Sequence, residues 1–358
     1  QLENVEPATV AGAIHALAPH PFHPDVLYVG SVNGGVWKTS NATAWSPGFV
    51  PLTDHLPSLS ISELEFDPTD PSWQTLVAGT GRQSALAREG GPEIGLYRTT
   101  DGGASWAVLG PADAGTCTGI VARGDSIVAG FSGAGVVRSR DAGATWQVVS
   151  GAGTGLPAGR IMDLVADRGA DGVLYAVLAR AAEAVGIYKS SDGGAAWTKV
   201  SDAAIDARIG LVTFNVELAV GHSGEVWAGI VNAGQVSGIF RSGDGGASWR
   251  QLDLPLFPAG EPQPVSCVVD GTPILVVAPG HGLADGDRVR VEGVTGTTAA
   301  NGLWRVGMAT AGAFELREVE FPFAPVAGNG AWTGGGVWQQ VVDINPRFRN
   351  QASPAAQG

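Results

Sequence analysis

The chain has 358 residues, of which 54 are glycine and only 15% are charged, and its net charge at pH 7 is −13. Such sparse charges exclude a coiled coil, and an ordinary apolar fraction of 44% excludes a mainly disordered chain. The acidic balance excludes a nucleic-acid-binding surface and disfavours an anionic membrane, so neutral ligands, cations and other proteins remain as partners.

Short apolar segments recur along the chain and predict β-strands in five successive groups. The first member of each group is expected to be an innermost strand, and these members are residues 14–18, 61–66, 119–122, 161–165 and 216–220. The second members are residues 26–30, 75–79, 126–130, 173–177 and 225–229. Polar or Pro-rich turns such as 67–71 join the two members, so five four-stranded blades are expected.

A short motif repeats after these strand pairs. Four segments superimpose without gaps, and they are TTDGGASW (99–106), SRDAGATW (139–146), SSDGGAAW (190–197) and SGDGGASW (242–249). A fifth, TSNATAW (39–45), is one residue shorter and has Asn41 in place of the aspartate. Successive motif tryptophans are 61, 40, 51 and 52 residues apart, a spacing that suits one blade for each motif.

These segments resemble the Asp-box or BNR repeat of sialidases, sortilin-type receptors and xyloglucanase-type glycoside hydrolases. The resemblance covers roughly residues 10–255 and implies a β-propeller. In physical terms, the aspartate accepts backbone N–H groups within a tight turn, glycine supplies positive φ, and tryptophan packs between blades. We therefore expect structural roles for Asp101, Trp106, Asp141, Trp146, Asp192, Trp197, Asp244 and Trp249.

Beyond Trp249 the pattern changes. Residues 254–264 are Pro-rich and predict a linker, and residues 265–337 alternate as half-buried strands of a small all-β, barrel-like module. Its stretch 281–290, with the glycines at 334–336, resembles a short β domain of phage-tail and other virion proteins, whose usual role is attachment or spacing. His281 is expected to be a turn residue, since no second metal-ligand type stands at a suitable spacing.

Residues 338–342, WQQVV, resemble the strand after a repeat motif, as in residues 249–252. This similarity predicts that the chain returns to the propeller at residue 338 and ends in a polar tail at 358. Propellers of this repeat type commonly have more than five blades. One hypothesis is therefore that a second chain or a removed segment completes the propeller.

The two cysteines and the six histidines offer little chemistry. Cys117 and Cys267 lie in different segments, and two unpaired thiols are favoured over one disulfide. His15, His20 and His23 cluster around a Pro-rich turn, where a surface turn is favoured over a metal site. The sequence predicts no metal and no cofactor.

A catalytic set is difficult to find. A sialidase needs an arginine triad, a nucleophilic tyrosine and an initial F/Y-R-I-P segment, and the chain lacks that segment and has no tyrosine outside the predicted repeat strands. Xyloglucanase-type enzymes have an aspartate before a Gly-Gly pair in the first blade, whereas residues 31–37, SVNGGVW, contain no carboxylate. Glu89 and Glu93, on a loop expected opposite the repeat turns, remain as weak catalytic candidates against a solvated-loop alternative.

The leading hypothesis is a secreted or cell-surface propeller that binds a protein or glycan without catalysis. Its expected contact residues are Arg82, Arg88, Glu89 and Arg160. One alternative is a propeller-type glycoside hydrolase acting on a polysaccharide. Another is a structural component of an extracellular or phage-like assembly, suggested by residues 265–337 alone.

Overall fold

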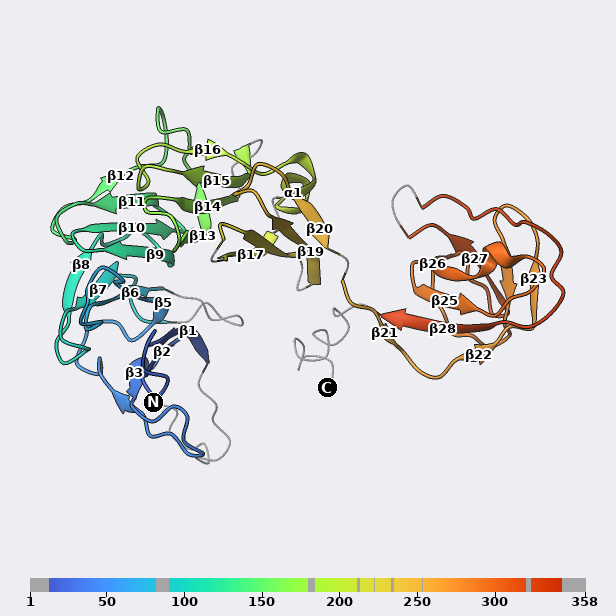
Figure 1. The fold of residues 1–358 in the computed structure, drawn as a ribbon, viewed down its shortest axis with the longest axis horizontal. Helices are drawn as coiled ribbons and strands as arrows, with labels where there is room; N and C mark the ends of the chain where they lie inside the picture. The colour runs from blue at the N-terminus through green and yellow to red at the C-terminus, as the bar shows by residue number, and fades with distance from the viewer. Residues whose placement is uncertain are drawn as a thin grey trace. The chain divides into compact units, whose positions relative to one another are not determined.

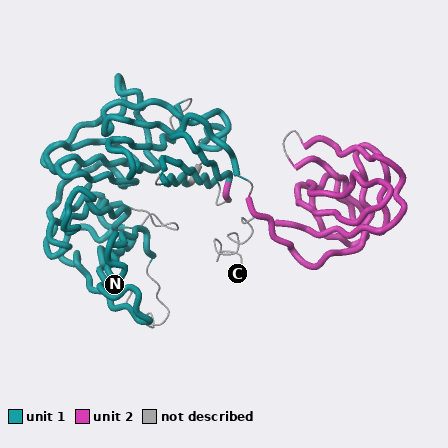
Figure 2. Tube along the Cα trace, viewed as in Figure 1, with its two compact units in different colours: residues 1–233, 237–252 teal, residues 234–236, 253–358 magenta. Residues whose placement is uncertain are grey.

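The computed structural model describes residues 13–81, 90–179, 184–210, 213–221, 223–232, 235–252, 254–319 and 323–342. The chain forms two compact units (Figure 2): unit 1 comprises residues 1–233 and 237–252, and unit 2 comprises residues 234–236 and 253–358. No helix among the described ranges is long and apolar enough to cross a lipid bilayer.

Unit 1 consists of five antiparallel four-stranded blades, and the fold is an all-β propeller as the sequence predicts. Blade 1 contains β1 (Ile14–Pro19), β2 (Leu27–Ser31), β3 (Gly35–Thr39) and β4 (Val50–Pro51). Blade 2 contains β5 (Ile61–Phe66), β6 (Leu76–Thr80), β7 (Leu96–Thr99) and β8 (Ala107–Gly110). Blade 3 contains β9 (Cys117–Arg123), β10 (Ser126–Phe131), β11 (Gly135–Ser139) and β12 (Gln147–Val148).

The last two blades flank the one α-helix that the described residues form. Blade 4 contains β13 (Arg160–Ala166), β14 (Leu174–Ala179), β15 (Gly186–Ser190) and β16 (Thr198–Lys199). The helix α1 (Ala203–Arg208) follows, capped by Asp202, whose carboxylate accepts backbone N–H groups at its start. Blade 5 contains β17 (Thr213–Val220), β18 (Val226–Asn232), β19 (Gln235–Ser242) and β20 (Arg250–Leu252).

The blades follow one another along an arc, with β1 and β17 at its two ends (Figure 1). The innermost strands of successive blades pack side by side in the order β1, β5, β9, β13 and β17. Apolar side chains from neighbouring blades form the core between them, including Ile61, Leu76, Ile127 and Ile161, all fully buried. The core of unit 1 is therefore a series of layers between blades rather than one central cluster.

The turn between the third and fourth strands of a blade is built around its aspartate. In blade 2 the Thr99 hydroxyl donates to the Asp101 carboxylate at 2.7 Å, and this carboxylate accepts the backbone N–H of Ser105 at 2.9 Å and its hydroxyl at 2.6 Å. The same pattern recurs around Asp141 and Asp244. The carboxylate of Asp192 accepts the backbone N–H groups of Ala195 and Ala196. We call these four turns the acidic turns.

Unit 2 is a small β module with one eight-stranded sheet. Its strands are β21 (Phe257–Pro258), β22 (Gln263–Pro264), β23 (Cys267–Val269), β24 (Leu275–Val277), β25 (Arg288–Glu292), β26 (Gly302–Gly307), β27 (Ala313–Arg317) and β28 (Val337–Val342), with the 3₁₀ turn η3 (Thr298–Ala300). His281 follows the turn at residues 279–280; its Nδ1 accepts the backbone N–H of Leu283 at 2.9 Å and its ring lies against Phe314.

The structure corrects two sequence-based boundaries. The strand predicted to return to the propeller, β28, instead pairs with β25 in unit 2, and Trp338 is buried in the core of that unit. The segment 254–264, expected to be a linker, contributes β21 and β22, both of which pair with β28. The first difference follows from packing, because the rest of the small sheet covers the indole ring of Trp338.

Candidate functional site

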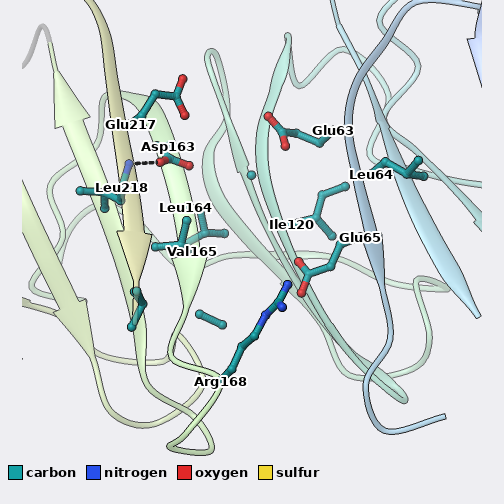
Figure 3. A pocket seen from close by; sticks show the side chains of 13 residues that line it. Glu63, Leu64, Glu65, Ile120, Asp163, Leu164, Val165, Arg168, Glu217 and Leu218 are labelled. Carbon is teal, nitrogen blue, oxygen red and sulfur yellow. Dashed lines mark hydrogen bonds between the residues drawn. The ribbon is translucent and has the colours of Figure 1, made fainter. Parts of the chain in front are cut away.

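A cavity of about 340 Å³ lies between the innermost strands of blades 2 to 5 (Figure 3). It is lined by residues of β5, β9, β13 and β17 and of the turn after β13, which are Glu63, Leu64, Glu65, Gly119, Ile120, Asp163, Leu164, Val165, Ala166, Arg168, Glu217, Leu218 and Val220. Four of the thirteen lining residues are acidic and one, Arg168, is basic, so the cavity is the main concentration of charge on the inner strands.

Three of the four carboxyl groups occupy the same position on their blades. Each lies opposite the same position of the second strand of its blade. The pairs are Glu63 with Gly79, Asp163 with Val177, and Glu217 with Gly229. Each is followed by a leucine, and each innermost strand delivers its carboxyl group to the same cavity (Figure 3). Blade 3 has Gly119 at this position, where a Cβ would lie 2.4 Å from the Leu164 carbonyl oxygen, so the glycine allows β9 and β13 to pack closely.

Asp163 is the most buried of these acids, with 6% of its surface exposed. Its Oδ2 accepts the backbone N–H of Leu218 at 2.5 Å, a bond that joins blade 4 to blade 5 (Figure 3). Burial, and then the negative charge of Glu217, raise the pKa of Asp163 to about 8, although backbone hydrogen bonds oppose the rise. Asp163 therefore retains its proton at neutral pH in much of the population.

The remaining acids differ in their surroundings. Burial, followed by the negative charges of Asp163, Glu217 and Glu65, holds the pKa of Glu63 well above its usual range. Glu217 is exposed and accepts a hydrogen bond from the Asn215 side-chain amide at 2.6 Å. Because like charges close together resist simultaneous ionisation, the neighbouring acids contribute to the raised pKa values of Glu63 and Asp163.

Glu65 lies at the other end of the cavity and has cationic neighbours. Arg123 pairs with it at 3.4 Å, and Arg168 extends toward it (Figure 3). Burial raises the pKa of Glu65 to about 7, and the two arginines limit that rise. The two arginines thus offset the negative charge of Glu65. Among the residues that the structure describes, Glu63, Asp163 and Glu217 form no ion pair.

The lining restricts what the cavity can hold. It has no aromatic side chain on which a sugar ring would stack. Within the described part of the chain, no group of three or more His, Cys, Asp or Glu residues is arranged to hold a metal ion. The convergent carboxyl groups are instead suited to accept hydrogen bonds from a cationic group or to donate and accept with hydroxyl groups.

Of the residues singled out from sequence, Glu93 and Arg160 are described, and neither lines this cavity. Arg82, Arg88 and Glu89 lie outside the described residues. Glu93 accepts a hydrogen bond from the Thr116 hydroxyl at 2.6 Å and so ties the loop before β7 to the start of blade 3. Arg160 begins β13, opposite Ala179 on β14.

Sequence reasoning missed Glu63, Asp163 and Glu217, although a signal was present. Aligning the innermost strands places all three acids at one position, directly before a leucine. A charged residue in an otherwise apolar inner strand is unusual, since burial of an unpaired charge is unfavourable. Its repetition in three of five blades indicates a shared environment.

No protein-family model matches the chain, and no curated protein matches it. Solved structures resemble it in fold. A GH74 xyloglucanase from Xanthomonas campestris has a TM-score of 0.52 and 17% identity, over 82% of this chain and 44% of that chain. An ancestral GH74 enzyme has a TM-score of 0.51 and 16% identity, over 92% and 38%.

A GH74 enzyme from Niastella koreensis also has a TM-score of 0.51 and 16% identity, over 92% of this chain and 45% of that chain. The chain therefore spans less than half the length of each of these structures. At such low identity the similarity establishes the propeller fold and does not extend to activity.

Proposed function

We propose that this chain is a non-enzymatic recognition propeller that binds a cationic group of a protein or glycan in the acidic cavity. One observation carries the proposal: Glu63, Asp163 and Glu217 reach the same cavity from the same position of three blades. The ligand group that fits is a primary amine or a guanidinium, because each donates several hydrogen bonds and carries the opposite charge.

The size and charge of the cavity support this assignment. Its volume of about 340 Å³ is at the lower end of small-molecule sites, which are roughly 300–1,000 Å³, and suits one side chain or one sugar unit. The basic side chain that lines it, Arg168, lies by Glu65 at the far end, so the carboxyl groups of Glu63, Asp163 and Glu217 have no basic lining residue beside them.

Binding of such a cation is linked to proton release. The pKa of Asp163 is about 8, and a cation placed beside it lowers that pKa by favouring the carboxylate. Affinity for an amine whose own charge does not change should therefore increase as the pH rises through about 8. A neutral ligand of the same shape should not show this dependence.

Matched ligands make a direct test. The panel pairs lysine and arginine peptides with their acetyl-lysine and citrulline counterparts, and glucosamine oligomers with their N-acetylated forms. Isothermal titration in buffers of different ionisation enthalpy measures both affinity and proton release. Asp163→Asn and Glu217→Gln should each weaken binding by roughly tenfold or more, whereas Glu261→Gln in unit 2 should not. Equal binding of cationic and neutral partners, or unchanged binding by Asp163→Asn, would contradict the proposal.

A glycoside hydrolase is the second candidate, and a specific observation favours it. A glycosidase needs two carboxyl groups, one of which holds a proton, and Asp163, with a pKa of about 8, lines the same cavity as Glu217. The lack of aromatic lining residues counts against it. Release of reducing sugar from a polysaccharide panel, abolished by Asp163→Asn and by Glu217→Gln, would replace the recognition proposal with this one.

Three finer assignments accompany the proposal. We propose that the acidic turns are Asp-box repeats, supported by their shared hydrogen bonds, and that the protein acts outside the cell, supported by repeat type and acidity. We further propose that unit 2 is an attachment module related to those of phage-like assemblies. Immunolocalisation in source cells and electron microscopy of native material test the location and the assembly.

A further inference from the structure

Neighbouring blades are joined by a repeated contact between a glycine and a bulky side chain. The Cβ that Gly30 lacks would lie 2.7 Å from Cγ2 of Ile61 on the next blade. Gly130 stands in the same relation to Ile161, at 2.8 Å. A side chain on either glycine would clash, so at these joints the second strand of one blade offers a gap that the innermost strand of the next blade fills.

A second contact accompanies the first. On the innermost strands of blades 2 to 5, the residue that follows Glu63 or its equivalent on the other blades is buried. These residues are Leu64, Ile120, Leu164 and Leu218, each 8% exposed or less. Side chains of the preceding blade cover this residue, as they do for Leu64 and Leu218. The equivalent residue of blade 1, Leu17, is 59% exposed.

A third contact connects the outer parts of neighbouring blades. A basic residue near the end of the third strand reaches the backbone carbonyl of the next acidic turn, as Lys189 does to Gly245 at 3.0 Å and Arg138 to Gly193 at 3.2 Å. In the opposite direction, two motif tryptophans donate to the preceding blade: Trp249 to the Val200 carbonyl at 2.8 Å and Trp146 to the Leu109 carbonyl at 3.0 Å. The joint between blades 4 and 5 is thus crossed by hydrogen bonds in both directions.

Each joint has a filling half, the innermost strand of one blade, and a receiving half, the second strand of the blade before it. Among the residues that the structure describes, nothing covers the filling half of blade 1 or the receiving half of blade 5. Blade 1 exposes the filling half: Ile14 is 60% exposed, although its counterparts Ile61 and Ile161 are fully buried, and Trp45 is fully exposed. Blade 5 exposes the receiving half, since a Cβ on Gly229 would meet nothing within 4 Å.

The other components of the receiving half are also present on blade 5. Trp227 is partly exposed, whereas its counterparts Tyr28 and Tyr175 are buried under the following blade. Arg241 stands at the position of Lys189 and, in place of a following turn, contacts Glu225 and lies over the ring of Trp227.

We propose that unit 1 associates head to tail with a second copy of this chain, with blade 5 of one copy packed against blade 1 of the other. A second copy is the fitting occupant because one chain carries both complementary halves of a joint that it already forms between its own blades. In this arrangement, Ile14 and Leu17 of one copy cover Gly229 of the other. Arg241 then contacts the turn at 39–45 of the neighbouring copy instead of Glu225. Such an interface is heterologous, so each copy retains one free end unless the ring closes.

The test uses the full chain and one variant for each end. Leu17→Glu places a charge in the filling half, and Gly229→Gln fills the gap of the receiving half. Both positions are open in the single chain, so the fold is retained. The matched controls are Val148→Glu, an equally exposed apolar residue of blade 3, and Gly243→Gln, a glycine of blade 5 with open space around it.

Sedimentation velocity over a range of concentrations gives the result. The natural chain and both controls should self-associate, and each end variant alone should be monomeric, with an association constant lower by roughly tenfold or more. An equimolar mixture of Leu17→Glu and Gly229→Gln should form a dimer that grows no further, since one intact joint remains between them. A natural chain that is monomeric at every concentration, or a mixture that fails to dimerise, would overturn the proposal.

Discussion

The Oδ2 atom of Asp163 accepts the backbone N–H of Leu218 at 2.5 Å, so one buried carboxyl group connects the innermost strands of two blades. This carboxyl group lies in a cavity with Glu63 and Glu217, and its pKa is raised to about 8 by burial and by Glu217. The hydrogen bond fixes the carboxyl group while its neighbours oppose its charge. Ionisation of Asp163 in the folded chain is therefore unfavourable and lowers the stability of the fold.

The first prediction concerns that cost. A carboxyl group whose pKa is higher in the folded than in the unfolded state binds more protons when folded, so stability falls as the pH rises between the two values, here from about 4 to about 8. Asp163→Asn keeps an oxygen for the N–H of Leu218 and removes the charge. It should stabilise the fold at neutral pH by an amount on the order of 3 kcal/mol.

Urea unfolding at a series of pH values measures this effect. The natural chain should lose stability between pH 4 and 8 relative to Asp163→Asn, and the two should converge at the acidic end of that window. Asp54→Asn, in the loop after β4, serves as a matched control. A variant that is less stable than the natural chain at pH 8 would show that the charge is compensated in a way that the described residues do not reveal.

The repeat made the propeller predictable. Each motif combines an aspartate turn with an anchoring tryptophan, and both depend on local chemistry that a short sequence contains. The cavity was harder to foresee, because Glu63 and Asp163 are far apart in the chain and meet only when the blades stack. The prediction that residues 338–342 return to the propeller was wrong for a related reason. WQQVV has the local pattern of an outer blade strand, but Trp338 is buried where the surrounding sheet of unit 2 covers it.

The second prediction concerns the acidic turns. Hydrogen bonds from Thr145 and then from Ser139 lower the pKa of Asp141 to about 2. A lowered pKa contributes stability above the unfolded value, and this contribution is lost as the pH falls from about 4 through about 2. Asp141→Asn should therefore be less stable than the natural chain at pH 7, with a melting temperature lower by roughly 2–4 °C.

The difference between these two chains should shrink on acidification, which thermal unfolding followed by circular dichroism at pH 7, 4 and 2.5 would measure. Asn41 shows that an amide can occupy the turn, since its Oδ1 accepts from the Thr39 hydroxyl at 2.8 Å. The variant should therefore fold. A difference that stays constant with pH would show that the carboxylate charge of Asp141 makes no contribution.

The third prediction concerns the thiols, which are both unpaired in the structure. Cys117 is completely buried, and burial followed by the charge of Glu63 raises its pKa far above the usual range. Cys267 is partly exposed. A thiol reagent should modify one cysteine in the native chain and two after unfolding, and Cys267→Ser should show no native reaction. Two rapidly reacting thiols in the natural chain would contradict the burial of Cys117.

The fourth prediction compares two glycines at equivalent positions of their blades. A Cβ on Gly79 would lie 2.5 Å from Sγ and 2.6 Å from Cβ of Cys117 on the next blade, whereas a Cβ on Gly229 would meet nothing within 4 Å. Gly79→Ala should therefore destabilise the chain by roughly 1–3 kcal/mol through overpacking. Gly229→Ala should stabilise it by up to about 1 kcal/mol, because alanine restricts the unfolded chain more than glycine does.

Urea unfolding at protein concentrations where the chain is monomeric separates the two effects from any association at Gly229. Since the substitution is identical and both positions lie on second strands, strand propensity cancels in the comparison. The difference between the variants then reports the presence of a following blade at Gly79 and its absence at Gly229. Equal destabilisation of both variants would mean that Gly229 is also covered, and that the two ends of unit 1 are not free in the single chain.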